Sequence, residues 1–569
     1  MRRGAGAVRP PTLHDPGQTE GNDMKTIARC AGGLAVVLGC LGLLAPQARA
    51  AAAGPGAPAA ACARLVRLAD AHLVISTARW VPAGPLPSGP MPVMPMLASV
   101  VLPANCLVRG VLDPRIGVGG VQYGLGFELR MPAHWNGRFL FQGGAGLDGF
   151  VAPAVGFVEP GTPTALGRGF AVISSDGGHE GMSAAFAADQ QARLDFAYAG
   201  LAPVTRLGKR LIRHFYGKPA RDAYFAGCSN GGREAMMVAE RDPTLFNGIV
   251  AGDPGFNLAR AAIAEMWNVR HLEAAAPKDA QGRPILSEAL TASDLQLLSR
   301  AVLKACDALD GLRDGMINNF AACQKVFHPQ TLQCRPGARG ACLSERKVKL
   351  LEAIFGGPHT TTGRALSARW PYDAGVAAPG WRVWKLGTSR TAMPNALDAT
   401  LGLEAMRQYF MTPADPHMTP QNFDFNRALQ VTRQVRAIND ASGTFLSSFI
   451  AHGGKLIIYQ GLSDPVFSPD AIIAWYRQLL AQYRRPQRFA RLFLVPGMNH
   501  CFGGPATDAF DPLRAIVRWS EQHRAPARLV AHGAAFPGVT RPLCPYPKYA
   551  RYVGGNPKSA NSFVCTKSS

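Results

Sequence analysis

Short runs of apolar and β-branched residues alternate with amphipathic stretches along most of this 569-residue chain. The runs that predict strands lie near residues 99–102, 107–112, 123–130, 138–142, 170–174, 223–226, 248–250, 455–459 and 491–495. Stretches that favour helices separate several of them, at 202–215, 232–241 and 470–483. This alternation is typical of an α/β fold in which helices cover both faces of a mostly parallel sheet.

The alternation stops between about residues 256 and 449. That segment has helical patches at 287–305 and 344–354, four cysteines and many Pro, Gly and Asn turns. We interpret residues 256–449 as an inserted lid domain. It interrupts a sheet domain that consists of residues 62–255 and 450–569.

The N-terminal residues predict export. Residues 1–23 are polar, and from Met24 two basic residues precede an apolar stretch, Ala31–Leu44, and the small-x-small site Ala48-Arg49-Ala50. This is the pattern of a secretory signal peptide, and the apolar stretch is shorter than the roughly 20 residues of a membrane span. We therefore expect cleavage near Ala50, a loose linker at residues 51–61, and a secreted or periplasmic protein. An alternative is lipoprotein processing at Cys40.

Composition excludes several classes of protein. With 47% hydrophobic and 17% charged residues, the chain can bury a large core and is not disordered as a whole. Its mean hydropathy of +0.01 and its single long apolar run do not fit a polytopic membrane protein, and we expect no stable membrane insertion. The net charge of +22 comes from scattered basic residues without a nucleic-acid-binding motif, so we expect no nucleic-acid partner. The oligomeric state cannot be inferred.

Ten cysteines follow the predicted signal peptide: Cys62, Cys106, Cys228, Cys306, Cys323, Cys334, Cys342, Cys501, Cys544 and Cys565. An even number in an exported protein predicts disulfides, here five. No C-x-x-C pair is present, which argues against zinc and redox motifs. The number of possible pairings is too large for the sequence alone to resolve.

Residues Gly227-Cys228-Ser229-Asn230-Gly231 match G-x-S-x-G, the motif of a nucleophile elbow. A strand-like run precedes the motif and a helix-like run follows it, as an elbow requires. The glycines permit the sharp turn, and the helix start directs N–H groups towards a developing oxyanion. The alternative is a Gly-rich strand–helix turn that contains an incidental serine.

A serine nucleophile needs a base, and the base needs an acid that orients it. Asp464 and His500 each follow a predicted strand, and the order Ser229, Asp464, His500 is that of α/β-hydrolases. Asp470 is better explained as an N-cap of the next helix. His179 precedes the nucleophile and is interpreted as structural, and a structural role is also the alternative for His500.

Cys228 and Cys501 are the sequence neighbours of the proposed nucleophile and base. If Ser229 and His500 touch, the two cysteines can lie within the roughly 4.4–6.8 Å Cα separation of a disulfide. Such a bond would restrict the position of the base.

These residues resemble the tannase and feruloyl esterase family of α/β-hydrolases, from about Cys62 to Cys565. The resemblance implies an α/β-hydrolase sheet with a large lid, and an oxyanion hole made by the backbone N–H groups of Asn230 and Gly144. It also implies the disulfide pairs Cys62–Cys106, Cys228–Cys501, Cys306–Cys323, Cys334–Cys342 and Cys544–Cys565.

Another constellation lies in the lid, where three carboxylates and two glycines alternate between Asp307 and Met316. Carboxylate and carbonyl oxygens are the ligands that Ca²⁺ prefers, although this is not an EF-hand and an acidic surface turn is the alternative. The resemblance implies a structural calcium ion held by Asp307, Asp310, Asp314 and the carbonyls of Leu312 and Met316.

The substrate that the resemblance implies is a small aromatic ester, cleaved through an acyl-enzyme. Trp384 falls at the tryptophan that lines the aromatic pocket in family members that hydrolyse mono(2-hydroxyethyl) terephthalate (MHET), although it could simply be core. Approximate alignment places Leu397 where those members carry an arginine for the substrate carboxylate, and Arg390 is the nearest arginine. We therefore expect a feruloyl or galloyl ester. The alternatives are a MHET-type hydrolase, a serine peptidase on the same fold, and an inactive binding protein.

Overall fold

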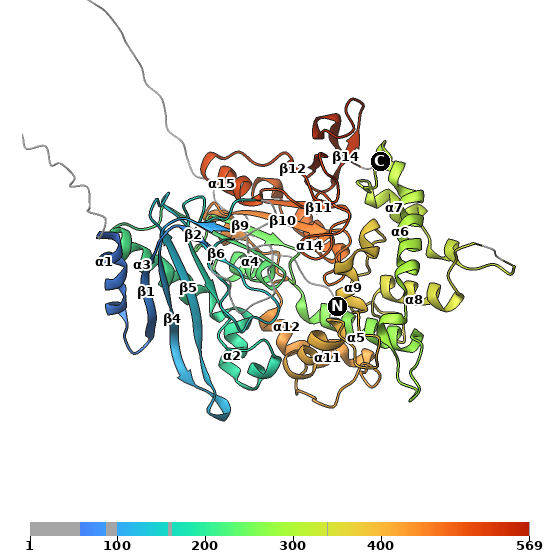
Figure 1. Cartoon of the computed structure of the whole chain (residues 1–569), viewed down its shortest axis with the longest axis horizontal. Coiled ribbons are helices and arrows are strands. Elements are labelled where there is room, and N and C mark those ends of the chain that lie inside the picture. The colour runs from blue at the N-terminus through green and yellow to red at the C-terminus, as the bar shows by residue number, and fades with distance from the viewer. Residues whose placement is uncertain (1–56, 87–99, 157–161, 338–339, 568–569) are drawn as a thin grey trace, which may run out of the picture. The chain divides into compact units, whose positions relative to one another are not determined.

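In the described part of the chain, nine strands form one sheet in the order β1-β4-β5-β7-β6-β8-β9-β10-β11 (Figure 1). The protein is described here by a computed structural model that covers residues 57–567 apart from 87–99, 157–161 and 338–339. The extension, the predicted signal peptide and the first residues of the linker lie outside these described residues.

Six of the nine strands run parallel to one another and form the half of the sheet that carries the site. In sheet order they are β7 (Ala171–Ser175), β6 (Arg138–Gln142), β8 (Asp222–Cys228), β9 (Gly248–Gly252), β10 (Lys455–Gly461) and β11 (Ala490–Val495). These strands are almost entirely buried, which explains their nearly continuous apolar runs. Because they are parallel, the loops after β8, β9, β10 and β11 meet at one edge of the sheet.

The other half of the sheet is antiparallel and consists of β1 (Leu73–Val81), β4 (Asn105–Ile116) and β5 (Gln122–Pro132). The sequence did not predict β1, an edge strand in which apolar positions are interrupted by Ser76, Thr77 and Arg79. The run near 99–102 contains a strand, as predicted, but this strand is not part of the main sheet. Its strand β3 (Val101–Leu102) pairs only with β2 (Gly84–Pro85), and the following Pro103 has no N–H for a longer ladder.

Helices cover both faces of the sheet, as predicted. The core cluster on one face includes residues of α3 (Leu201–Tyr216), α4 (Asn230–Arg241) and α14 (Pro469–Gln482), which correspond to the predicted helices. A separate cluster includes residues of α15 (Pro512–Gln522). The expectation for Asp470 was wrong in detail: Ser468 caps α14 and accepts a hydrogen bond from Ala471 N–H, because the helix already begins at Pro469.

Between β9 and β10, the described residues form helices and loops but no strand. The longer helices are α5 (Leu258–Ala275), α6 (Ala292–Cys306) and α8 (Glu345–Gly356), and shorter ones include α7 (Phe320–Val326), α9 (Pro379–Lys385), α11 (Ala428–Val431) and α12 (Arg433–Asn439). The helix predicted at 287–305 corresponds to α6 but begins later than expected, because Thr291 is its N-cap residue. This segment has its own core, but Ile263 and Met406 also pack in one cluster with Phe196 of the sheet domain. The lid as a separate domain stays a prediction.

The C-terminal residues form two small antiparallel pairs that the sequence did not reveal. Strand β12 (Leu529–Ala531) pairs with β13 (Arg541–Leu543), and β14 (Lys548–Tyr552) pairs with β15 (Phe563–Lys567). No helix among the described residues is both long enough and apolar enough to cross a membrane.

Candidate active site

Ser229 lies in the sharp turn between β8 and α4, as the G-x-S-x-G motif predicts. Its backbone has φ +65° and ψ −123°, a conformation that is unfavourable for a residue other than glycine and is often found at functional sites. The flanking glycines are required by close packing. A Cβ on Gly227 would lie 2.7 Å from the Gly231 backbone, and a Cβ on Gly231 would lie 2.7 Å from the Gly144 carbonyl oxygen.

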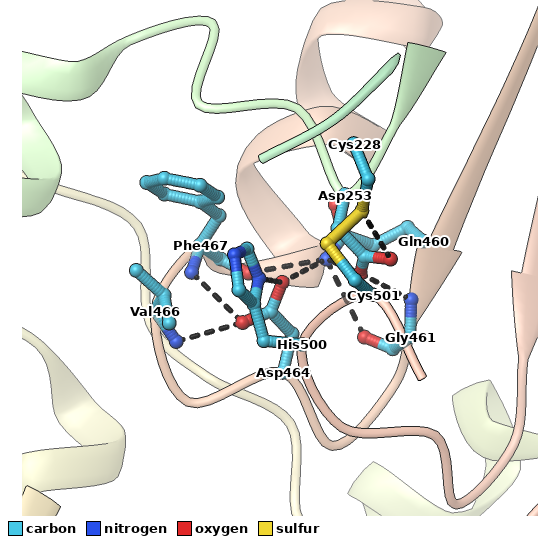
Figure 2. Close-up of a disulfide and its surroundings, with 9 residues drawn as sticks. All are labelled: Cys228, Asp253, Gln460, Gly461, Asp464, Val466, Phe467, His500 and Cys501. Carbon is cyan, nitrogen blue, oxygen red and sulfur yellow. Dashed lines mark hydrogen bonds and ion pairs between the residues drawn. A yellow bond between two sulfur atoms is a disulfide. The ribbon is translucent and has the colours of Figure 1, made fainter. Parts of the chain in front are cut away.

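Asp464 and His500 form a hydrogen-bonded pair in the loops that follow β10 and β11, which β9 separates from the nucleophile strand β8. His500 Nδ1 lies 3.0 Å from Asp464 Oδ2, and Asp464 Oδ1 accepts hydrogen bonds from Val466 N–H (2.7 Å) and Phe467 N–H (3.1 Å) (Figure 2). Burial raises the pKa of Asp464, but the charge and hydrogen bond of His500 and the N–H donors outweigh burial and keep this pKa below its usual value. Asp464 is therefore suited to be the ionised member of a triad.

The other nitrogen of His500 is available. His500 Nε2 is buried and has no hydrogen-bond partner among the described residues. Ser229, which is partly exposed, makes no side-chain hydrogen bond within the same part of the structure. Hydrogen bonds between catalytic groups are often long in the absence of substrate. The missing hydrogen bond between Ser229 and His500 Nε2 is therefore compatible with the triad.

A disulfide joins the nucleophile turn to the histidine loop. Cys228 and Cys501 are bonded with a Cα–Cα separation of 6.0 Å, which places the neighbouring Ser229 and His500 on two loops that meet at this point. The other bonds in the structure are Cys62–Cys106, Cys306–Cys323, Cys334–Cys342 and Cys544–Cys565. These five pairs are the ones that the family resemblance implies.

The lid contributes to the support of both triad loops, which the sequence did not reveal. Asp373 Oδ2 accepts hydrogen bonds from Ser463 Oγ and Gly497 N–H, both at 2.7 Å. Trp370 Nε1 donates to the backbone carbonyl of Asp464 at 3.0 Å. Both lid residues are more than 140 residues from the nucleophile along the chain. Trp370 holds the backbone of the acid, and Asp373 holds the residue before the acid and the start of the loop that carries the base.

The backbone N–H of Gly144, predicted to bind the oxyanion, is already occupied in the structure. It donates to Glu234 Oε2 at 2.9 Å. Asn230, the other predicted donor, is the first residue of α4, where N–H groups have no acceptor within the helix. The role of both N–H groups stays a prediction, and Gly144 must exchange its present hydrogen bond to fulfil it.

Behind these donors lies a buried polar network that sequence reasoning missed. The Asn230 side chain donates to Asp148 Oδ1 (2.7 Å) and accepts from Arg233 Nε (2.6 Å). Burial, followed by the neighbouring Glu234, raises the pKa of Asp148 well above its usual value, and burial also raises the pKa of Glu234. Two adjacent buried carboxyl groups share one proton more easily than they ionise together. The only signal in the sequence was Glu234, an acidic residue one turn into the helix that follows the nucleophile.

Aromatic rings lie against the candidate base. The ring centroids of Trp384 and Phe467 lie 5.6 Å and 5.2 Å from that of His500, both in edge-on arrangements. Trp384 is partly buried and packs with Phe467 in a small apolar cluster that also contains Leu258, Ala261 and Val466. Trp384 thus lies beside the base, and its role in lining a substrate pocket stays a prediction. Phe467 was not predicted.

The predicted calcium ligands share one loop but do not converge tightly in the structure. Asp307 accepts hydrogen bonds from Asp314 N–H and Gly315 N–H, and Asp314 forms an ion pair with Arg541. Burial, with a further contribution from the Asp314 charge, raises the pKa of Asp310 to about 6.

Among the described residues, the sets of three ligand-type side chains with atoms within 4.8 Å of one another lie elsewhere. They are Cys228, Asp253 and Cys501, and Asp253, Asp464 and His500. The first set contains the disulfide cysteines, and the second contains the candidate acid and base.

Comparison with known proteins gives consistent results. A sequence model of the family described as "Tannase and feruloyl esterase" matches residues 106–566. The mono(2-hydroxyethyl) terephthalate hydrolase of Piscinibacter sakaiensis is 39% identical over 546 residues, which cover 87% of this chain and 89% of that protein.

Two solved structures resemble this one in fold. Feruloyl esterase B from Aspergillus oryzae has a TM-score of 0.74 at 24% identity and covers 90% of this chain and 100% of its own. Tannin acyl hydrolase from Aspergillus niger has a TM-score of 0.66 at 20% identity and covers 88% of this chain and 92% of its own.

Proposed function

The chain belongs to the tannase and feruloyl esterase family and is a carboxylic ester hydrolase with an α/β-hydrolase sheet, and from this premise we propose that it cleaves phenolic acid esters through an acyl-enzyme on Ser229. One observation carries the proposal. His500 is bonded to Asp464 through Nδ1, while its buried Nε2 has no partner in the described structure and lies on a loop that a disulfide joins to the turn of Ser229. The peptidase and inactive-binding alternatives lose support, because the family description and the relatives named above refer to ester hydrolysis.

The arrangement supports a two-step reaction. His500 Nε2 takes the proton from Ser229 Oγ as this oxygen bonds to the ester carbonyl carbon, and then gives the proton to the departing alcohol. In the second step His500 Nε2 takes a proton from water as the water oxygen adds to the acyl carbon. The bond between this carbon and Ser229 Oγ then breaks, and His500 returns the proton to Ser229 Oγ as the acid is released. Asp464 holds the tautomer of His500 that leaves Nε2 unprotonated and stabilises the imidazolium that forms in each step.

Negative charge on the carbonyl oxygen needs N–H donors. We assign this role to the backbone N–H groups of Asn230 and Gly144. In the structure the Gly144 N–H donates its hydrogen bond to Glu234. This hydrogen bond must break before the Gly144 N–H can bind the oxyanion.

The residues around Trp384 favour a phenolic acid over MHET. Leu397 is partly buried, and the neighbouring Asp398 is fully buried and paired with Lys385 at 3.0 Å. Arg390 is exposed and pairs with Glu288. A substrate carboxylate would therefore meet no free arginine at this position in the described structure, whereas a neutral phenolic ring can pack against Trp384 and Phe467. The 39% identity to a MHET hydrolase keeps terephthalate monoesters as the second candidate.

We also propose that Asp307, Asp310, Asp314 and the carbonyls of Leu312 and Met316 hold a structural calcium ion. The donor chemistry fits a hard cation. The raised pKa values of Asp307 and Asp310, caused first by burial and increased by the Asp314 charge, indicate excess negative charge that a cation would offset. The ion pair between Asp314 and Arg541 competes with the cation, so the two must coexist or exchange.

Export from the cytosol is part of the same proposal. Five disulfides in the described residues need an oxidising compartment. The signal-like segment from Met24 to Ala50 supplies a route to the periplasm or the exterior.

One preparation tests the proposal. Methyl ferulate, methyl gallate and MHET are compared by kcat/KM with the parent and the Ser229→Ala variant. We expect the phenolic esters to be preferred, and Ser229→Ala to retain only the contribution of binding and the oxyanion hole, a loss of about 10⁶-fold in kcat by analogy with other serine hydrolases. Preference for MHET would favour the second candidate, and near-parental activity of Ser229→Ala would place the nucleophile elsewhere.

A further inference from the structure

Asp253 occupies the loop between the nucleophile turn and the acid. It follows β9, which lies between β8 and β10 in the sheet, and it is fully buried. Its φ of +34° lies in the left-handed region that residues other than glycine rarely adopt. The backbone is fixed on both sides, because Asp253 N–H donates to the Tyr459 carbonyl at 2.9 Å and the preceding carbonyl of Gly252 accepts from Ser229 N–H at 3.0 Å.

The Asp253 side chain is bonded to the strand that leads to Asp464. Asp253 Oδ1 accepts hydrogen bonds from Gly461 N–H (2.8 Å) and Gln460 Nε2 (2.9 Å). The same Gln460 nitrogen lies 2.9 Å from Asp464 Oδ2, so one amide bridges the two carboxyl groups. Figure 2 shows Asp253 between this bridge and the disulfide, where its Oδ2 lies 3.8 Å from Cys228 Sγ.

The charge state of Asp253 follows from these contacts. Oxygen or nitrogen atoms of Asp253, Asp464 and His500 all lie within 4.8 Å of one another. Two buried carboxyl groups this close do not both ionise readily. Burial raises the pKa of Asp464. The charge and hydrogen bond of His500, the Val466 N–H and a side-chain hydrogen bond with Asp253 lower it by more, so the pKa lies below its usual value and Asp464 carries the charge. A carboxyl group that forms a hydrogen bond with an ionised carboxylate must itself carry a proton. Asp253 is therefore the protonated, neutral member of the pair.

We propose that Asp253 is a second acid of this site, a positioning residue that shares one proton with Asp464 and carries the negative charge when Asp464 cannot. The inference rests on the proposed triad. In the parent, the Asp253 hydroxyl donates to Asp464 and holds that carboxylate in line with His500. If Asp464 is replaced by a neutral residue, Asp253 loses its proton to solvent, and its carboxylate, near His500, stabilises the imidazolium.

A double-mutant cycle tests this inference. We measure kcat and KM for Asp464→Asn, Asp253→Asn and the double variant on methyl ferulate, with active sites titrated. Replacing the acid of a serine triad by Asn costs about 10⁴-fold in kcat where no second acid exists. Here we expect Asp464→Asn to cost only about 10²-fold, Asp253→Asn about 3- to 10-fold, and the pair the full 10⁴-fold or so. KM should change little, because neither residue contacts the substrate.

The controls separate this outcome from simple loss of structure. Glu128→Gln is the matched control, because Glu128 is a buried carboxyl on β5, separated from β8 by two strands, and it should leave kcat unchanged. Melting temperatures report the folding of each variant. Two results would overturn the inference. One is a loss of about 10⁴-fold in kcat from Asp464→Asn alone, and the other is an equal fold-loss from Asp253→Asn in the parent and in the Asp464→Asn variant. The Asp464→Asn measurement is decisive even if the double variant does not fold. Activity retained in Ser229→Ala would instead refute the proposed triad.

Discussion

Removal of the Cys228–Cys501 bond should reduce both stability and turnover. The two cysteines are 273 residues apart. For a loop of that length the chain-entropy model gives a stabilisation of roughly 5–6 kcal/mol, against roughly 3 kcal/mol for a loop the size of Cys544–Cys565, which spans 21 residues. The Cys228→Ala/Cys501→Ala variant should therefore melt lower than the matched Cys544→Ala/Cys565→Ala variant.

The effect on turnover has a different cause. Ser229 and Cys501 both have positive φ values, +65° and +67°, so the turns beside the bond are held in unfavourable backbone conformations. When the bond is absent, these turns can relax and move His500 away from Ser229. A displacement of about 1 Å in catalytic geometry can cost about 100-fold in rate.

The assay is the turnover number per titrated active site, measured well below the melting temperature of each variant. We expect a loss of about 10- to 100-fold for the triad disulfide and a parental value for the control disulfide. Normal turnover per site in the first variant would show that the bond only stabilises the fold. Peptide mapping that finds free thiols at both positions in the parent would remove the premise.

Three further predictions concern other parts of the molecule. Addition of EDTA should lower the melting temperature, since calcium at 100 times its dissociation constant stabilises by about 2.7 kcal/mol, and Asp310→Asn should abolish this response. Burial raises the pKa of Asp176 to about 7, so the native state keeps a proton that the unfolded chain has lost, and stability should fall as pH rises from about 4 to 7. In Asp176→Asn this fall should be smaller, as measured by urea titrations at pH 5 and 8. Trp384→Ala should raise KM for aryl esters about 2- to 12-fold with less effect on kcat, and an unchanged KM would remove Trp384 from the pocket.

The parallel half of the sheet could be predicted because buried parallel strands give continuous apolar runs in the sequence. Ser229, Asp464 and His500 could be proposed as a triad for a related reason. Each follows such a run, and parallel strands bring their C-terminal ends to one edge. Strand β1 was missed because it is an edge strand in which polar and apolar positions mix. The pairs β12–β13 and β14–β15 were missed because they are isolated from the main sheet and only three to five residues long.

The missed parts of the site depend on contacts between distant residues. Asp253 follows β9 as an ordinary loop residue would, and nothing in its neighbourhood shows that Gln460, 207 residues later, joins it to the acid. Likewise, the family resemblance implies that the Gly144 N–H faces the oxyanion, but not that Glu234 accepts the hydrogen bond of that N–H. The hydrogen-bond partners of these residues depend on how distant segments pack together, and the local pattern of a single sequence does not show this packing.

The hydrogen bonds from the lid to the triad loops limit how freely this protein can exchange parts with its relatives. A lid transplanted from another family member would bring a new substrate pocket, but it would keep the acid and base in place only if it restored an acceptor for Ser463 and Gly497 and a donor for the Asp464 carbonyl. Chimeras that carry Asp373 and Trp370 across with the surrounding backbone should therefore outperform chimeras that graft only the pocket-lining residues. Evolution of new specificity in this architecture is then expected to proceed by substitutions within the lid more readily than by its replacement.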